Sequence, residues 1–393
     1  MPDAPVAYLD HAASTPLRPE AHDAVLAVLE ASYANPSGSH RAARAARQLV
    51  DEARDVVAEA LGARPGEVVF TSGGTEADNL AVLGVHARRA GAVFCSAVEH
   101  PAVAEAVAAV GGRTVAVDER GALDVAALEA ELDACAARDE PVALVSVMGV
   151  NNEVGTIEPL EAVAAVVRER APGARLHTDA VQAVPWIDVA PQAAGFDLVA
   201  LSAHKFGGPK GVGALVVREG VDLAPLLLGG GQERERRSGT QNVAGIVGLA
   251  AALAVTVEER KATVERVAAL RDRLADGLVA AVPGLVETGV AAAGGGSPDR
   301  SHKVAGACHV CIEGIESESL LFLLEEAGVY ASAASSCASG AMEPSPVLAA
   351  MGVSREAARG ALRLSLGATT TDADVALALA AVPAAVERLR RFP

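Results

Sequence analysis

The sequence predicts an α/β fold with a mainly parallel sheet and helices on both of its faces. Short Val-rich runs alternate along the chain with longer Ala-rich amphipathic stretches, which is the pattern of strands joined by crossover helices. Glycine and proline bound the short runs, as expected for buried strands. Strands are expected at residues 68–71, 92–96, 142–147, 175–179, 196–201 and 212–217.

A second, smaller α+β domain is expected in the C-terminal part of the chain. A helical pattern covers about 243–282, a Gly-rich segment follows at 289–298, and the strand and helix pattern then starts again. We therefore expect a large domain over residues 16–254 and a small domain that combines 1–15 with 255–393. With 393 residues, 51% of them hydrophobic, the chain is long enough to form two cores.

Composition limits the partners and the location of the protein. The net charge of −17 argues against direct binding to nucleic acid or to an anionic membrane, because either would need a basic face. The sequence shows neither a signal peptide nor a stretch long enough to span a bilayer, so a cytoplasmic location is expected. The five cysteines are scattered over the chain, which disfavours structural disulfides.

Residues 202–211 place a lysine, Lys205, at the start of a glycine-rich turn between two predicted strands. Burial beside the core lowers the pKa of a lysine and makes its amine a better nucleophile. A lysine that forms a Schiff base needs this property. A solvated turn lysine is the alternative when this stretch is taken alone.

A candidate phosphate site lies in residues 71–76, Thr-Ser-Gly-Gly-Thr-Glu, where a predicted strand ends and a helix begins. Gly74 allows backbone N–H groups at the helix N-terminus to meet a phosphate, and the Thr75 hydroxyl adds a donor. The motif is neither Gly-x-Gly-x-x-Gly nor a P-loop, which disfavours dinucleotides and nucleoside triphosphates. An ordinary capped turn is the alternative.

Polar residues follow other predicted strands, at the edge of an open α/β sheet where ligands bind. His100 offers a flat ring that could stack on an aromatic ligand, although a surface histidine is the simpler interpretation. Asp179 could pair with a protonated ring nitrogen, and Asn152 and Gln182 lie near such strand ends too. A lysine for an aldehyde, an aspartate for a pyridinium nitrogen and a phosphate cradle are together what pyridoxal phosphate requires.

Several longer motifs support this cofactor. They are Asn35-Pro36-Ser37, Thr75-Glu76-Ala77-Asp78-Asn79, Asn151-Asn152-Glu153-Val154-Gly155-Thr156, Ser202-Ala203-His204-Lys205 and Gly229-Gly230-Gly231-Gln232-Glu233-Arg234. Through these motifs, in this order, the chain resembles the cysteine desulfurases, pyridoxal-phosphate enzymes of fold type I in the class V aminotransferase group. The resemblance runs from Tyr8 to Gly367.

The resemblance implies roles for individual residues. Lys205 would carry the cofactor and act as a catalytic residue, His100 would stack on the ring and relay protons, and Asp179 would face the ring nitrogen. Asn152 would contact the cofactor ring oxygen or the substrate, and Arg363 would bind the substrate. The other implied cofactor contacts are Gly74, Thr75, Gln182, Ser202, His204 and Thr240. The resemblance also implies a homodimer in which Thr240 reaches across to the other subunit, and it implies no metal.

Cys337 is the third implied catalytic residue. It lies in Ala333–Gly340 among Ser, Ala and Gly residues, and such a loop leaves a thiol accessible enough to act as a nucleophile. In the family, the cysteine in this place takes sulfur from L-cysteine as a persulfide and L-alanine is released. Residues 341–346 resemble the longer form of this loop, which passes sulfur to separate acceptors such as an iron–sulfur scaffold or a tRNA-thiolation enzyme.

Arg363 is expected on a strand in which Leu362, Leu364 and Leu366 share one face, so that Arg363 points the other way. Its planar fork suits an α-carboxylate, and the alternative is an arginine on a solvated face. Cys308 and Cys311 form a Cys-x-x-Cys pair in an apparent strand. With no second pair at suitable spacing for zinc, buried packing cysteines are the favoured interpretation.

Two alternative functions stay open. Another class V pyridoxal-phosphate enzyme, an aminotransferase or a selenocysteine lyase, would share the cofactor residues without using Cys337 in the same way. A non-enzymatic sulfur- or metal-binding scaffold built on Cys308 and Cys311 would bind no cofactor.

Overall fold

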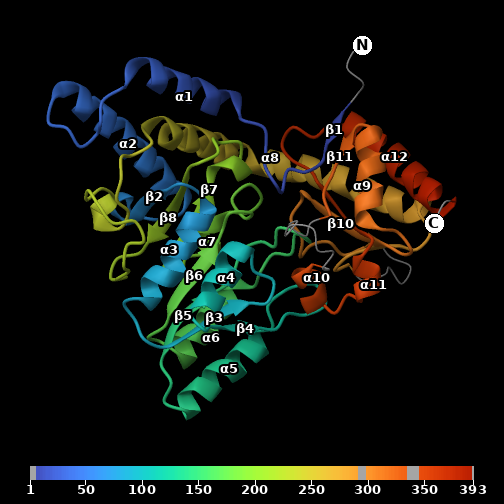
Figure 1. Ribbon diagram of the computed structural model, residues 1–393, viewed down its shortest axis with the longest axis horizontal. Coiled ribbons are helices and arrows are strands. Elements are labelled where there is room, and N and C mark those ends of the chain that lie inside the picture. The colour runs from blue at the N-terminus through green and yellow to red at the C-terminus, as the bar shows by residue number, and fades with distance from the viewer. Residues whose placement is uncertain (1–5, 291–297, 334–344, 392–393) are drawn as a thin grey trace.

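The computed structural model describes residues 6–290, 298–333 and 345–391 (Figure 1). Cys337, which carries one of the predicted catalytic roles, therefore lies outside the described residues. Figure 1 shows a large sheet with its helices and a second group of strands and helices, joined by the long helix α8 (Val243–Ala281).

The large sheet has seven strands in the order β2-β8-β7-β6-β5-β3-β4. The strands β3, β4, β5, β6 and β7 run parallel to one another, whereas β8 runs antiparallel to both β7 and β2. Their bounds are β2 Val68–Thr71, β3 Ala92–Ser96, β4 Arg113–Val115, β5 Val142–Ser146, β6 Arg175–Asp179, β7 Leu198–Ser202 and β8 Gly213–Val217. The mainly parallel α/β fold is confirmed, and the six predicted strands agree to within two residues with the observed ones.

Helices cover both faces of this sheet because successive strand residues point to opposite sides. In β7, Val199 and Leu201 join one apolar core and Leu198 and Ala200 join the other. The first core packs on α2 (Arg41–Ala60), α5 (Val125–Ala137), α6 (Leu160–Arg170) and the start of α8, with α1 (Pro19–Ala31) against α8. The second core packs on α3 (Gly74–His86) and α4 (Pro101–Ala109).

The second group of elements surrounds an antiparallel sheet of β9 (Leu285–Glu287), β10 (Ala307–Ile312) and β12 (Ala361–Ser365). A short parallel pair joins β1 (Ala7–Tyr8) to β11 (Val329–Tyr330), which brings the N-terminal segment to this part of the protein. The helices here are α9 (Ser317–Glu326), α10 (Pro346–Ala350), α11 (Arg355–Ala358) and α12 (Asp372–Arg391).

Helix α8 contributes to the first core of the large sheet and to the core around the small sheet. Leu249 and Leu253 near its start are buried in the large-sheet core, whereas Leu270, Leu274 and Leu278 are buried against β10, β12 and α12. The domain boundary proposed at 254/255 falls inside this helix. A continuous helix at that boundary gives the two parts a stiff connection.

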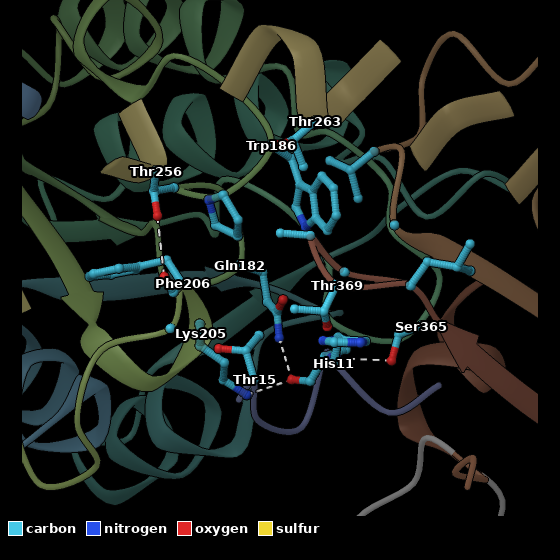
Figure 2. A pocket seen from close by; sticks show the side chains of 18 of the residues that line it. His11, Thr15, Gln182, Trp186, Lys205, Phe206, Thr256, Thr263, Ser365 and Thr369 are labelled. Atoms are coloured by element: carbon cyan, nitrogen blue, oxygen red, sulfur yellow. Dashed lines mark hydrogen bonds between the residues drawn. The ribbon is translucent and has the colours of Figure 1, made fainter. Parts of the chain in front are cut away.

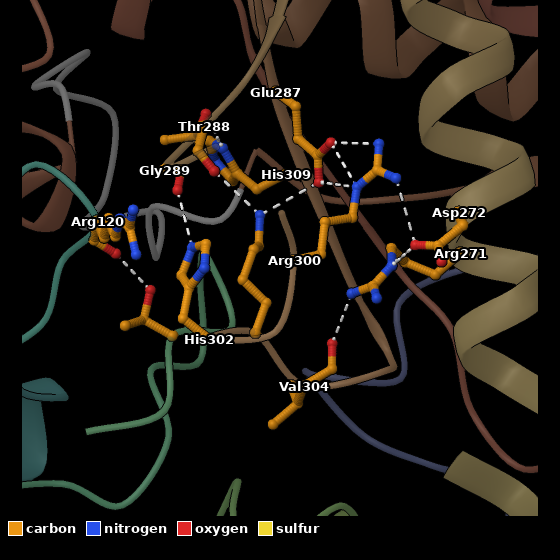
Figure 3. A network of polar contacts seen from close by, with 12 residues as sticks. Arg120, Arg271, Asp272, Glu287, Thr288, Gly289, Arg300, His302, Val304 and His309 are labelled. Atoms are coloured by element: carbon orange, nitrogen blue, oxygen red, sulfur yellow. Dashed lines mark hydrogen bonds and ion pairs between the residues drawn. The ribbon is translucent and has the colours of Figure 1, made fainter. Parts of the chain in front are cut away.

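A network of buried charges supports the small sheet (Figure 3). Arg300 donates to both oxygens of Glu287 at 3.1 and 2.8 Å, and to Asp276 of α8 at 2.6 Å. Lys303 donates to the Thr288 carbonyl oxygen at 3.0 Å and lies 3.4 Å from Glu287. Because buried charges need partners, these ion pairs tie α8 to the end of β9.

Cys308 and Cys311 lie on opposite faces of β10. Cys308 packs in the core beside α8, and Cys311 packs in a separate cluster with Met351. Burial raises the pKa of the Cys308 thiol to about 12, and burial also raises the pKa of Cys311. The prediction that they are buried packing residues is confirmed, because neither thiol is a ready thiolate and they do not face one another.

Among the described residues, no helix has the length and apolar character needed to cross a membrane.

Candidate functional site

A cavity of about 470 Å³ lies where β5, β6 and β7 end, beside the start of α3. Its lining brings together almost every residue for which the sequence predicted a role in the site. The predicted residues that line it are Gly74, Thr75, His100, Asn152, Asp179, Gln182, Ser202, His204, Lys205 and Arg363. Thr240 is exposed and does not line this cavity of its own chain.

Lys205 ends a 3₁₀ turn, Ala203–Lys205, that directly follows β7. Its Nζ donates to the carbonyl oxygens of Ala12 at 2.6 Å and Ala13 at 3.0 Å. Burial lowers the pKa of Lys205 to about 8, Arg363 adds to this shift, and Asp179 and Asp10 oppose it. The prediction of a lysine held near the core with a lowered pKa is confirmed.

Asp179 is the last residue of β6, and its Oδ1 accepts a hydrogen bond from the Val181 N–H at 2.8 Å. Burial raises the pKa of Asp179 to about 7, and the neighbouring Asp78 adds to this shift. Within the part of the chain that the structure describes, no ion pair neutralises this carboxyl, so burial favours its protonated form. A protonated ring nitrogen next to Asp179 would supply a positive charge.

His100 is the N-cap of α4, and its Nδ1 accepts from the Ala102 N–H at 3.2 Å. Burial lowers the pKa of His100; Asp179 opposes this shift and Lys205 adds to it. The neutral ring therefore carries its proton on Nε2, since Nδ1 is an acceptor. His100 is held by a helix end and is no freely solvated surface histidine.

The start of α3 forms one end of the cavity. The first N–H groups of a helix have no partner within it, which makes this end suitable for a phosphate. A Cβ on Gly74 would lie 2.8 Å from Val181 Cγ2 and 3.4 Å from Ser202 Cβ, so the close packing of helix start and strand end requires glycine. Thr75, Ser202 and His204 add side-chain donors on the same wall.

Arg363 is buried at 5% exposure, and it borders the cavity from β12. Its Nη1 donates to the Asn152 carbonyl oxygen at 3.0 Å and its Nη2 to Asp10 Oδ1 at 2.8 Å. Its Nε is buried with no hydrogen-bond partner in the described part of the chain. The guanidinium thus keeps free donors for a carboxylate, and the alternative of an arginine on a solvated strand face is wrong.

Asp78, for which no role was predicted from the sequence, also lines the cavity. Asp78 Oδ1 lies 3.5 Å from His177 Nε2, and the other ring nitrogen of His177 lies 2.8 Å from Ser146 Oγ. Burial raises the pKa of Asp78 well above its ordinary value. A signal was present, because Asp78 shares the buried face of α3 with Ala77 and Ala81, and a carboxyl on a buried helix face is unusual.

A smaller cavity of about 220 Å³ adjoins the first one (Figure 2). The two share part of their lining, including Ala12, Gln182 and Lys205. The side chains of Gln182 and Lys205, which Figure 2 shows pointing toward one another, both donate to the Ala12 carbonyl oxygen, at 2.7 and 2.6 Å. The Ala12 backbone therefore forms a wall common to both cavities.

These residues fit pyridoxal phosphate. The cavity offers an amine with a lowered pKa, a buried carboxyl that lacks a cation, a ring for stacking and a helix start with hydroxyl donors. Each feature matches a different part of the cofactor: the aldehyde, the ring nitrogen, the ring face and the phosphate. Among the described residues, no group of His, Cys, Asp and Glu side chains could hold a metal ion.

Comparison with known proteins agrees with this fit. The family model for class V aminotransferases matches residues 7–377. An IscS-like cysteine desulfurase of Mycobacterium tuberculosis (strain ATCC 25618 / H37Rv) is 42% identical and aligns over 98% of both chains. A solved NifS-like protein is 33% identical with a TM-score of 0.87, over 98% of this chain and 100% of its own.

Another solved relative, SspA in complex with cysteine, is 29% identical with a TM-score of 0.77, over 93% of this chain and 100% of its own. The match with the family model and with the relatives thus extends over nearly the whole chain. The chain belongs to the class V aminotransferase family and, within it, to the cysteine desulfurases.

Proposed function

We propose that this protein is a pyridoxal-phosphate-dependent cysteine desulfurase that converts L-cysteine to L-alanine and receives the sulfur on Cys337. The observation that carries the proposal is that Lys205, Asp179 and Arg363 line one cavity. A Schiff-base lysine, a partner for the ring nitrogen and an arginine for the substrate carboxylate come from three different elements and meet at this cavity.

Pyridoxal phosphate, when bound, supplies an electron sink for the pair released at the substrate α-carbon. Lys205, with a pKa of about 8, can take the α-proton at near-neutral pH. Asp179 would keep a proton on the ring nitrogen, and His100 would stack on the ring and pass protons through Nε2. Arg363 and Asn152 would orient the substrate through its α-carboxylate.

Cys337 then supplies the second half of the reaction. Its thiolate attacks the substrate sulfur, and the bond between the substrate Cβ and sulfur breaks with its electron pair left on Cβ. Protonation at Cβ gives alanine, and Cys337 holds the sulfur as a persulfide. Cysteine and one protein thiol are thus converted to alanine and one protein persulfide, with no external oxidant or reductant. We propose that a sulfur-acceptor protein, such as an iron–sulfur scaffold or a tRNA-thiolation enzyme, takes this sulfur in the cytoplasm.

We also propose that the protein acts as a homodimer in which Thr240 completes the site of the partner subunit. Tyr33 is 92% exposed and Leu228 is 83% exposed, which is unusual for such large side chains. Their loops lie together, because Gln232 Nε2 donates to Ser37 Oγ at 2.6 Å. The Ser238 N–H, two residues before Thr240, donates to the Leu227 carbonyl oxygen at 3.4 Å. These exposed apolar side chains, in and beside the loop that leads to Thr240, support a subunit contact there.

The backbone of the loop that precedes Thr240 also supports a functional role. Glu233, Arg234 and Glu235 have φ values of 46°, 56° and 64°, a left-handed conformation that costs non-glycine residues free energy. A buried ion pair between Arg54 and Glu233, at 2.8 Å, holds this loop against β2. Backbone strain of this kind persists only where the surrounding structure holds it, and it clusters at functional sites.

Product analysis tests the proposed function. The purified protein with pyridoxal phosphate, L-cysteine and a thiol reductant should release alanine and sulfide in equal amounts. An aminotransferase would instead yield a keto acid and no sulfide, and a non-enzymatic scaffold would neither bind the cofactor nor release a product. Either of those results would contradict the proposal.

A further inference from the structure

A buried carboxyl links the turn of Asn152, which lines the cavity, to the start of α10. Glu153 is 7% exposed and Ser345 is 3% exposed, and Ser345 Oγ donates to Glu153 Oε2 at 2.5 Å. The same hydroxyl oxygen accepts from the N–H groups of Val347 at 3.1 Å and Leu348 at 3.3 Å. A hydroxyl has a single hydrogen, so these bonds fix both its donor and its acceptor directions.

Glu153 belongs to the turn that presents Asn152. Asn151 Oδ1 accepts from the N–H groups of Glu153 and Val154, both at 2.9 Å, and Asn151 Nδ2 donates to the Val98 carbonyl oxygen at 3.0 Å. This turn is therefore tied to the segment that leads to His100. Its Asn152 carbonyl oxygen also accepts from Arg363.

The described residues on either side of the segment that contains Cys337 are bonded to Arg363 and to the turn of Asn152. Ser332, before the segment, pairs with Arg363 through backbone hydrogen bonds of 2.7 and 3.2 Å. Ser345, after it, is bonded to Glu153. The two attachments thus lead to the substrate arginine and to the Asn152 turn.

We propose that Glu153 is a positioning residue for sulfur transfer, because its bond to Ser345 fixes the downstream end of the Cys337 segment relative to the Asn152–Arg363 pair. This inference rests on the proposed function and deepens it. A carboxyl serves this task better than an apolar side chain, since it accepts the Ser345 hydroxyl and faces the positive Arg363. Burial raises the pKa of Glu153, while the Ser345 hydrogen bond and Arg363 oppose that shift.

Substitutions at both ends of the bond test the proposal in the full-length holoenzyme. Glu153→Met keeps the length of the side chain and removes the acceptor, whereas Glu153→Gln keeps an acceptor oxygen. Ser345→Ala removes the donor. Ser354→Ala is the matched control, because Ser354 caps α11 and has no carboxylate partner among the described residues. The readouts are the affinity for L-cysteine, from the cofactor absorbance, and the rate of persulfide formation in a single turnover.

We expect Glu153→Met and Ser345→Ala to slow persulfide formation by about tenfold, the loss typical of a hydrogen bond to a charged group. Their affinity for cysteine should stay unchanged, Glu153→Gln should retain most of the rate, and the double variant should be no slower than either single one. Ser354→Ala should match the wild type. Unchanged rates in Glu153→Met and Ser345→Ala, or equal slowing by Ser354→Ala, would overturn the inference.

Two further comparisons separate a folding defect from a loss of positioning, and a failure of this inference from a failure of the proposed function. If Glu153→Met does not fold, Ser345→Ala and Glu153→Gln alone decide, since an unchanged rate in Ser345→Ala overturns the inference. Cys337→Ser is measured in parallel: normal alanine release by that variant would refute the proposed function itself. A dead Cys337→Ser beside a fully active Ser345→Ala would refute only the role of Glu153.

Discussion

The Nζ atom of Lys205 donates a hydrogen bond to the carbonyl oxygen of Ala12 at 2.6 Å, across 193 positions of sequence. Because β1 pairs with β11, the segment after β1 reaches the lysine from the small-sheet side of the protein. Backbone oxygens thus hold the amine, while burial lowers its pKa to about 8. The lysine is kept in place and is partly neutral near physiological pH.

This pKa gives a first prediction. Only the neutral amine attacks the aldehyde of pyridoxal phosphate, so the rate of cofactor attachment to the cofactor-free protein should rise with pH and level off above about 8. Borohydride trapping followed by mass spectrometry measures the rate. Lys205→Ala should give no trapped cofactor, and the exposed Lys210→Ala should behave as wild type. If the attachment rate instead reached its half-maximal value near the ordinary pKa of lysine, burial would not lower the pKa of Lys205.

Asp179 gives a second prediction, for the cofactor-free protein. A folded-state pKa raised to about 7 stabilises the fold at low pH, and that stabilisation is lost as the pH rises through 7. Relative to Asp179→Asn, the wild type should therefore lose stability between about pH 4 and 8, by up to roughly 4 kcal/mol. Chemical denaturation of both proteins across this range measures the difference. Parallel stability curves would show that Asp179 is not the titrating group. The other titratable groups that interact with Asp179 are Asp78, Glu99, His100, His177 and Lys205.

Arg363→Ala should bind the cofactor normally and bind cysteine poorly. The loss of a charged, two-bond contact in a buried site should cost on the order of 2 kcal/mol, which is about thirtyfold in affinity. A titration of the cofactor spectrum with cysteine measures this effect. Arg359→Ala, at an exposed arginine nearby, is the control. Equal cysteine affinity in the two variants would remove Arg363 from the substrate site.

The shared site of the proposed dimer can be tested by mixing two variants. Thr240→Val should weaken cofactor binding by roughly fivefold, the loss of one neutral hydrogen bond, and Lys205→Ala should lose covalent attachment. A mixed dimer contains one complete site if Thr240 serves the partner subunit, so cofactor affinity at that site should return to the wild-type value. If Thr240 serves its own subunit, or no subunit at all, mixing will restore nothing.

Local sequence patterns were enough to predict most of the fold. The strands from Val68 to Val217 were found because each is short, apolar and bounded by turn residues. The edge strand β4 was missed, since Arg113-Thr114-Val115 is too short and polar to stand out. Helix α8 was predicted almost to the residue, but a periodic pattern cannot show that one helix serves two cores.

The candidate site was predicted largely from motifs, with family resemblance supplying most of the roles. The contacts around those residues could not be found this way, because they join distant parts of the chain. The Ala12 carbonyl that holds Lys205 is a backbone group and leaves no mark in the sequence. Asp10 beside Arg363 and Asp78 beside His177 depend on packing between elements far apart in sequence.

The role of Cys337 in sulfur transfer is tested most directly by one measurement. Alanine release from L-cysteine is compared between the wild type and Cys337→Ser, and mass spectrometry searches for one added sulfur on the wild-type peptide that contains Cys337. A serine hydroxyl is a far poorer nucleophile toward sulfur than a thiolate. The serine variant should therefore bind the cofactor and cysteine but release alanine only at the background rate, and the added sulfur should lie on Cys337. Near wild-type alanine release by Cys337→Ser, or an added sulfur on Cys308 or Cys311 instead, would contradict the account.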